Sequence, residues 1–168
     1  SHPVHVTGSK LTMIAGGKIG DSDTNSPANI NTKAIVTQVG SLAARSGTGI
    51  YTQELDALSI ESISNSVVQV NFRGNTTDRT QVLEDLTTTS NGPIKLQSLA
   101  GSITVNAGTA GTNGITANGT GDILLQTLSG GNINTDAGIL SGTGHITLDA
   151  AGTLTSSGPI QTLSLIHI

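Results

Sequence analysis

The sequence predicts an all-β fold: a right-handed parallel β-solenoid with about 20 to 23 residues per coil, forming one elongated domain over residues 1–168. A short Gly-x-Ile-x-[Leu/Val/Thr] unit recurs through the second half of the chain. The chain contains 22 glycines, which favour turns and weaken helices. Only 1% of its residues are aromatic, so the core must be built from Ile, Leu, Val and Ala, which suit the narrow interior of a coil.

The repeated unit occurs six times after residue 91. Its copies are Gly92-Pro-Ile-Lys-Leu96, Gly101-Ser-Ile-Thr-Val105, Gly121-Asp-Ile-Leu-Leu125, Gly131-Asn-Ile-Asn-Thr135, Gly144-His-Ile-Thr-Leu148 and Gly158-Pro-Ile-Gln-Thr162. The clearest copies start at Gly101, Gly121 and Gly144, which are 20 and 23 residues apart, and this spacing sets the expected coil length. The chain would then hold about seven or eight coils, stacked about 4.8 Å apart. Parallel crossovers are nearly always right-handed, so this is the expected hand.

Each copy of the unit has the pattern of a short strand with one buried face. Apolar residues alternate with polar ones at Ile103, Val105 and Ala107. Segments rich in Gly and Asn, such as 107–114 and 141–144, separate the strands and predict turns. An antiparallel meander or sandwich is the alternative, but the linkers vary in length and lack regular hairpin signals.

The first half of the chain, residues 1–91, predicts looser coils with longer loops, and residues 92–162 predict the regular coils. Apolar runs in the first half predict strands at 4–6, 11–14, 34–39, 49–52, 58–60 and 66–72. No Pro/Ser-rich linker divides the two halves, which favours one continuous domain.

One segment of the first half is compatible with two structures. Residues 73–78 form a polar loop. Residues 78–86 could form one or two helical turns, because Val82, Leu83 and Leu86 would then share a face. The same residues are equally compatible with a projecting loop.

Composition excludes several classes of protein. The chain has no cysteine, so disulfides and Cys-ligated zinc are impossible. Nucleic acid is a poor partner, because seven Lys and Arg residues and two aromatic residues provide neither a basic stripe nor a stacking surface. No apolar run approaches the roughly 20 residues needed to span a bilayer.

Both ends of the chain look cut. Residues 1–4 lack an initiator Met and the features of a signal peptide, and residues 163–168 end on an apolar stretch without a polar tail. We therefore expect a fragment of a larger protein, whose last residues need not be native. Its neighbours would be further coils of the same parent chain, and exposed end coils would promote aggregation.

Two stretches of the chain resemble a known group of proteins. The first stretch contains Gly17-Lys-Ile-Gly-Asp21, Ser26-Pro-Ala-Asn-Ile30, Val39-Gly-Ser-Leu-Ala-Ala44, Gly49-Ile-Tyr-Thr52 and Asp56-Ala-Leu-Ser-Ile60. The second stretch contains Leu86-Thr-Thr-Thr89, Asn91-Gly-Pro-Ile-Lys-Leu96 and Gly101-Ser-Ile-Thr-Val105. Together they are similar to the repeats of filamentous-haemagglutinin-like, very large bacterial exported adhesins. The resemblance is one of repeat style over roughly residues 10–162. It implies a right-handed β-helical rod at the cell surface and leaves the ligand and the export route open.

Polar loop 21–29 and the histidines are weak candidates for metal binding. Asp21-Ser-Asp-Thr-Asn25 copies the first half of a calcium loop, but Ser26 and Thr32 stand where Gly and Glu are needed. We therefore expect an ordinary polar turn. The four histidines are scattered at His2, His5, His145 and His167 and show no ligand or triad spacing.

Carboxylates are the remaining candidates for chemistry. Glu54, Asp56 and Glu61 cluster in the sequence, and paired carboxylates can cleave glycosides. Because Tyr51 is the only aromatic residue nearby and the regular coils after Lys95 contain no Lys or Arg, we expect solvated loop charges instead. The later acids Asp122, Asp136 and Asp149 are spaced 14 and 13 residues apart and should not form a single row.

These observations favour a non-catalytic structural stalk or adhesin segment of a bacterial surface or secreted protein, which presents or spaces a binding region. We expect no catalytic residue, no metal and no cofactor; the partner would be a glycan or protein surface. The alternative is a polysaccharide lyase or glycoside hydrolase, with its groove between Glu54 and Asp85. A phage or polymer-binding fibre is a third interpretation.

Overall fold

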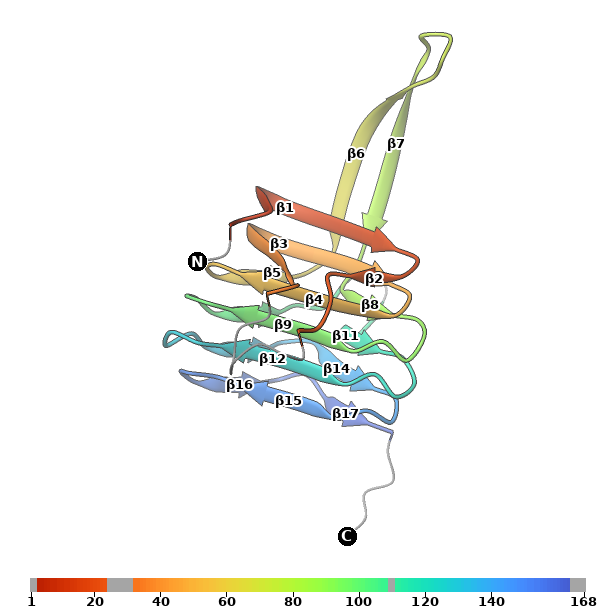
Figure 1. Ribbon diagram of the computed structural model, residues 1–168. Coiled ribbons are helices and arrows are strands. Elements are labelled where there is room, and N and C mark those ends of the chain that lie inside the picture. The colour runs from red at the N-terminus through yellow and green to blue at the C-terminus, as the bar shows by residue number, and fades with distance from the viewer. Residues whose placement is uncertain (1–2, 24–31, 109–110, 164–168) are drawn as a thin grey trace.

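The computed structural model describes residues 3–23, 32–108 and 111–163, and within them the protein is built of strands alone (Figure 1). The strands are β1 (Val6–Ala15), β2 (Lys18–Ile19), β3 (Ile35–Ser46), β4 (Gly49–Glu54), β5 (Leu58–Ile60), β6 (Ile63–Val70), β7 (Thr76–Leu83), β8 (Leu86–Thr88), β9 (Ile94–Ser98), β10 (Ile103–Val105), β11 (Asn113–Ala117), β12 (Ile123–Thr127), β13 (Ile133–Thr135), β14 (Gly138–Ser141), β15 (Ile146–Asp149), β16 (Leu154–Ser156) and β17 (Ile160–Thr162). In this described part of the chain, no helix is long and apolar enough to cross a membrane.

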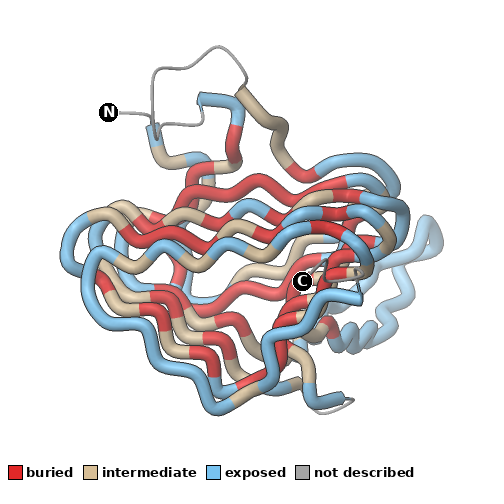
Figure 2. The backbone as a smooth tube through the Cα atoms, turned by 90° about the horizontal axis from the view of Figure 1, so that it is seen from below, coloured by how far each residue is buried: buried red, intermediate tan, exposed pale blue. Residues whose placement is uncertain are grey.

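Fifteen of the strands form one parallel sheet that wraps around a central core (Figures 1 and 2). They stack in three columns. Column A contains β2 and the start of β3 (residues 35–37), then β4, β9, β12 and β15. Column B contains β1 up to Leu11 and the middle of β3 up to Leu42, then β5, β10, β13 and β16. Column C contains the ends of β1 and β3, then β8, β11, β14 and β17. The all-β, parallel prediction is confirmed, and the antiparallel alternative is wrong for this sheet.

The number of residues in each coil is the sequence distance between residues that pair in successive strands of one column. One position of column A is occupied in turn by Ile19, Ile50, Ile94, Ile123 and Ile146. These residues are 31, 44, 29 and 23 positions apart in the chain. The expected 20 to 23 residues therefore hold only for the last coils, and in place of the expected seven or eight levels the described residues form six, which are the strands stacked in column B. The extra residues leave the stack at its corners, most of them in the segment 61–85.

The copies of the Gly-x-Ile unit lie in different columns. Those at Gly92, Gly121 and Gly144 precede strands of column A, those at Gly101 and Gly131 precede column B, and that at Gly158 precedes column C. The expectation that Gly101, Gly121 and Gly144 are each one coil apart is therefore wrong. Gly101 precedes a strand of column B, whereas Gly121 and Gly144 precede strands of column A. The unit marks the entry to a strand, and each coil can contain it more than once.

The repeated glycines lie where successive coils touch. A Cβ atom at Gly121 would overlap the backbone carbonyl of Gly92, and one at Gly144 would overlap that of Gly121. We expect Gly121→Ala to lower the free energy of unfolding by about 1–3 kcal/mol, which is the usual cost of overpacking. Urea denaturation measures this loss. Gly16→Ala is the control, because a Cβ there meets no atom within 4 Å. Equal losses in the two variants would contradict this explanation.

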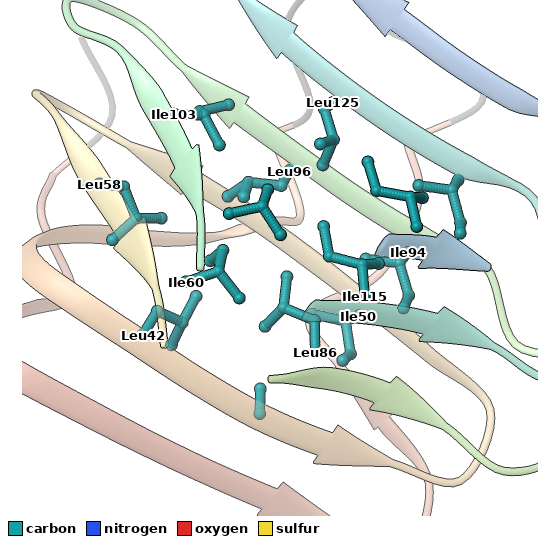
Figure 3. Close-up of a cluster of buried hydrophobic side chains, with 14 of the residues drawn as sticks. Leu42, Ile50, Leu58, Ile60, Leu86, Ile94, Leu96, Ile103, Ile115 and Leu125 are labelled. Carbon is teal, nitrogen blue, oxygen red and sulfur yellow. The ribbon is translucent and has the colours of Figure 1, made fainter. Parts of the chain in front are cut away.

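The interior of the stack is aliphatic. Figure 3 shows Leu42 and Ile60, which stack on each other in column B, in the same core as Leu86 of column C. One row of column C consists of Met13, Ala44, Leu86, Ile115, Ile139 and Ile160. Ile139 is 0% exposed, whereas Ile160, in the last strand, is 42% exposed. Each level therefore buries the level before it, as in a repeat protein.

Hydroxyl groups close the corners of the coils. Thr88 Oγ1 donates to the carbonyl of Gly92 at 2.7 Å, and Thr127 Oγ1 donates to that of Gly131 at 2.7 Å. Both threonines end a strand and are buried. Each hydroxyl is thus paired with a turn carbonyl, which is the condition for burying it; the carbonyl of Gly131 also accepts from the backbone N–H of Gly152 at 2.9 Å.

Amide side chains form a second ladder along column A. Gln53 Nε2 donates to Gln97 Oε1 at 2.7 Å, Gln97 Nε2 donates to Gln126 Oε1 at 2.6 Å, and Gln126 Nε2 donates to Asp149 Oδ2 at 2.8 Å. The four residues share one register position. Stacked amides of this kind reinforce the parallel register, as in cross-β assemblies.

Candidate functional site

A hairpin projects from the stack at the corner between β5 and β8. Its strands β6 and β7 pair antiparallel, from Ile63 opposite Leu83 to Val70 opposite Thr76. Figure 1 shows this hairpin rising along the stack and past β1. The projecting-loop prediction for 78–86 is therefore the better one, and the helical one is wrong, because Thr76–Leu83 is a strand.

The base of the hairpin is fixed to the stack. Ile63 and Leu83 are buried with Ala43 in a second, small apolar cluster on the outside of β3. Asn65 Nδ2 then donates to Thr12 Oγ1 of β1 at 2.9 Å. Residues 63 and 65 lie on the same face of β6, because side chains alternate along a strand. We call this the inner face of the hairpin.

The opposite face, which we call the outer face, is exposed and mixes valines with polar side chains, because Val68 stands opposite Asp78 and Val70 opposite Thr76. It carries Val68 and Val70 of β6 and Val82 of β7, which are 61%, 64% and 55% exposed. Phe72 at the tip is 95% exposed, and Arg73 lies 5.4 Å from the centre of its ring. The strand predicted at 66–72 is confirmed up to Val70, where β6 ends, while Phe72 lies in the turn; the apolar side chains of this segment do not join the core. An isolated two-stranded hairpin is marginally stable in water, and exposed apolar side chains on one are unusual, which makes the hairpin a candidate functional site.

Glu54, the first of the predicted carboxylates, is buried at the end of β4. It occupies the register position that Ser98 occupies in the next coil. Thr37 Oγ1 donates to its Oε2 at 2.7 Å, and the backbone N–H groups of Val39 and Leu55 donate to its Oε1 at 3.1 and 3.0 Å. Burial raises the pKa of Glu54 above its ordinary value, against these hydrogen bonds. Glu54 is 0% exposed, and its hydrogen bonds join the end of β4 to β3.

Asp56 follows Glu54 and lines a cleft of about 470 Å³ on the outside of the stack. The cleft is lined by Thr7, Gly8, Gln38, Val39, Gly40, Asp56 and Ala57. Asp56 adds to the rise in the pKa of Glu54, so these two carboxylates are neighbours. Glu61 lies beyond β5 and is not among the lining residues. Among these described lining residues none is basic or aromatic, and Asp56 is the one carboxylate.

Asp85, the other limit of the predicted groove, has an unusual environment. Its φ is 65°, and its Oδ1 is buried with no hydrogen-bond partner in the part of the protein that is described. Burial and the neighbouring charge of Glu84 raise its pKa to about 6, against the backbone N–H of Gly108. Asp85 and Glu54 lie at different corners, because Glu54 ends β4 and Asp85 precedes β8.

The raised pKa of Asp85 predicts a pH dependence of stability. Between its unfolded pKa of about 4 and the folded value of about 6, the folded state binds the proton more tightly, so stability falls as pH rises. We expect Asp85→Asn to raise the melting temperature at pH 7 and to leave it unchanged at pH 4. Asn accepts positive φ, so the backbone is preserved. A variant that is less stable than the wild type at pH 7 would contradict this prediction.

The remaining predicted sites do not converge. Among the described residues, no group of three or more His, Asp and Glu residues could hold a metal ion. Asp21 accepts from Lys18 Nζ at 2.8 Å and from the backbone N–H of Ser22, while residues 24–31 of the calcium-like loop lie outside the described residues. His5 accepts from the backbone N–H of Val36 at 3.1 Å, and His2 and His167 also lie outside the described residues.

The three later acids each have a different local partner. Asp122 accepts from the backbone N–H of His145 at 2.8 Å, Asp149 accepts from Gln126, and Asp136 accepts from Ser157 Oγ at 3.3 Å. They occupy different positions of the coil and form no row.

Comparison with known proteins does not assign the chain to a family. No protein-family model matches the chain, and neither a curated protein nor a solved structure matches it. The hairpin is therefore the candidate functional site on its geometry alone. The sequence signal that could have found it is the alternating run that ends at Val70, followed by the Gly-containing segment 71–75, which is typical of a hairpin turn.

Proposed function

We propose that this chain is a non-catalytic structural segment of a right-handed parallel β-solenoid, belonging to a large exported protein of the filamentous-haemagglutinin-like adhesin type, and that it presents the β6–β7 hairpin as a binding region. The observation that carries the proposal is the outer face of the hairpin. Val68, Val70 and Phe72 are held in water at the end of an arm whose base is anchored in the stack.

The stack supports the role of a spacer. Its strands are parallel and its coils bury one another, so length is added without a new core. Right-handedness is proposed from the general preference of parallel crossovers. The bacterial source, the export and the location outside the cell or on its surface rest on the resemblance in repeat style.

The chemistry of the outer face favours a protein surface over a glycan as the partner. Aliphatic Val68, Val70 and Val82 bind by excluding water from apolar surface. The single aromatic residue, Phe72, provides little of the stacking platform that sugars require. Phe72 is the residue whose truncation should cost the most binding, because large side chains dominate protein interfaces.

Adhesion of coated beads tests the proposal. Beads carrying the chain are applied to cultured epithelial cells, and bound beads are counted against bare beads. We expect the Phe72→Ala and the Val68→Ser/Val70→Ser variants to lose adhesion by about tenfold or more. Val67→Ser, on the inner face of the same strand, is the control and should adhere like the wild type. If wild-type beads bind no better than bare beads, a protein on the surface of these cells is ruled out as the partner.

The absence of catalysis is tested separately. The buried Glu54 and the neighbouring Asp56 are the observation that favours the alternative, a lyase or hydrolase. The chain is incubated with a broad panel of polysaccharides, and released product is measured with and without Asp56→Asn. Product that depends on Asp56 would overturn the non-catalytic proposal.

A further inference from the structure

The hairpin offers a strand edge as well as two faces. Among the described residues, β6 pairs with β7 alone, and the two form a sheet separate from the fifteen-stranded one. Residues 63–83 are internal to the chain, so this edge belongs to the protein whatever precedes or follows the stack. Figure 1 shows the far part of the hairpin standing away from the stack. A sheet of two strands is marginally stable in water, so further strands would stabilise this arm.

The backbone groups of every second residue of β6 point away from β7. Asn71 donates its backbone N–H to the carbonyl of Asn75 at 3.0 Å, which is a hydrogen-bonded pair that continues the β6–β7 register. Because hydrogen-bonded and non-hydrogen-bonded pairs alternate along an antiparallel ladder, the odd-numbered residues of β6 bond to β7. The N–H and C=O groups that face the free edge are therefore those of Ser64, Ser66, Val68 and Val70.

These groups fit a second copy of the same strand. The base of β6 is held to the stack at Ile63 and Asn65, so we exclude Ser64, and Ser66, Val68 and Val70 are left for pairing. Val68 is the midpoint of these three residues. Two antiparallel β6 strands can therefore pair with Val68 opposite Val68 and with Ser66 opposite Val70. Each such pair exchanges two backbone hydrogen bonds.

From these observations we infer that the protein forms a dimer with a second copy of this chain, in which the two β6 strands pair antiparallel about a two-fold axis at Val68. This goes beyond the proposed function, in which the outer face binds another protein. The two hairpins form one four-stranded sheet with the stacks at its opposite ends. The paired residues all lie on the outer face, so Val68 and Val70 of both copies meet on one side of this sheet. The contact is isologous and closes at two copies.

Charge decides between the two edges of the hairpin. Strand β6 has no charged residue, whereas β7 carries Asp78 and Arg79. The groups of β7 that face its own free edge belong to the even-numbered residues, which lie opposite those of β6. The same pairing of two β7 strands would thus be centred on Asp78 and would place two carboxylates opposite each other. Like charges directly opposite are destabilising, and charged side chains protect an edge from pairing.

Matched proline variants test which edge pairs. Ser66 and Thr80 lie opposite each other, and the backbone N–H of each faces a free edge, so proline at either position leaves the β6–β7 hydrogen bonds in place. Sedimentation equilibrium over a wide range of concentration measures the mass. We expect the wild type to approach twice the mass of one chain. Ser66→Pro should raise the dimer dissociation constant by about tenfold or more, and Thr80→Pro should behave like the wild type.

Two results of this experiment overturn the inference. One is a wild type that stays monomeric at every concentration. The other is a Thr80→Pro variant that dissociates as readily as Ser66→Pro, because the β6 edge would then have no special role. Circular dichroism confirms that each variant is folded.

Disulfide formation tests the register, because the chain has no cysteine of its own. Only Val68 meets itself in the dimer, so Val68→Cys should form a disulfide-linked dimer with oxidised glutathione as the oxidant. Val70→Cys is the control and should stay unlinked alone, but it should link to Ser66→Cys when the two variants are mixed. Val70→Cys that links to itself as well as Val68→Cys does would overturn the inference.

The dimer and the proposed function can fail independently. Ser66→Pro keeps Val68, Val70 and Phe72, so we expect its beads to adhere to cells like those of the wild type. Adhesion by a wild type that forms no dimer would refute the dimer alone. A wild type that dimerises without adhering would refute the proposed partner alone.

Discussion

Ile139→Ala is expected to lower the free energy of unfolding by about 2–5 kcal/mol, the range for removing a buried aliphatic side chain and leaving a cavity. Ile139 is 0% exposed and lies in column C between Ile115 and Ile160 of the neighbouring levels. Because the coils are joined by backbone hydrogen bonds on both sides, they cannot close around the cavity. The measurement is urea denaturation followed by circular dichroism in dilute solution.

Ile160→Ala is the matched control. Ile160 is the same residue type at the same position one level further along, but it is 42% exposed and has a neighbour on one side only. We expect its loss to be less than half that of Ile139→Ala. If the two losses were equal, burial by neighbouring levels would not be the source of stability, and the stacked architecture would be in doubt.

Glu54→Ala is expected to destabilise the protein by at least about 2 kcal/mol, because it leaves buried donors without an acceptor. The donors are the Thr37 hydroxyl and the backbone N–H groups of Val39 and Leu55. Thermal and urea unfolding at neutral pH would both report the loss.

Glu54→Gln separates the hydrogen bonds from the charge. Gln keeps one oxygen acceptor in the same place and removes the buried charge, whose cost is what raises the pKa of Glu54. We expect this variant to retain most of the stability. A Gln variant as unstable as the Ala variant would show that the ionised carboxylate itself is needed.

Local patterns were sufficient to predict the strands and the composition of the core. Alternation at Ile103 and Val105, and the glycine that precedes them, predicts a strand and a turn correctly. The grouping of the repeats was not predictable in the same way. Gly101 and Gly121 precede the same pattern, yet one begins column B and the other column A. Coil length was misjudged for this reason, because the unit occurs more than once in a coil.

In the candidate site, too, local patterns predict the strands but not their place in the fold. Alternation at Val68 and Val70 predicts a strand whether the strand joins the sheet or leaves it. Only the pairing of β6 with β7, away from the fifteen-stranded sheet, exposes these side chains. Glu54 likewise appears as one of several loop acids in the sequence. The register across a long coil places it at the corner where Ser98 stands in the next coil.

The sequence by itself determined that the chain forms short strands, glycine turns and an aliphatic core without cysteine or a large aromatic cluster. These properties depend on neighbours a few residues apart. The tertiary structure alone decided which strands stack, which acid is buried and which apolar side chains stay in water. Those outcomes depend on how many residues of each coil lie outside the stacked strands. That number is fixed only by the packing of each level on the next.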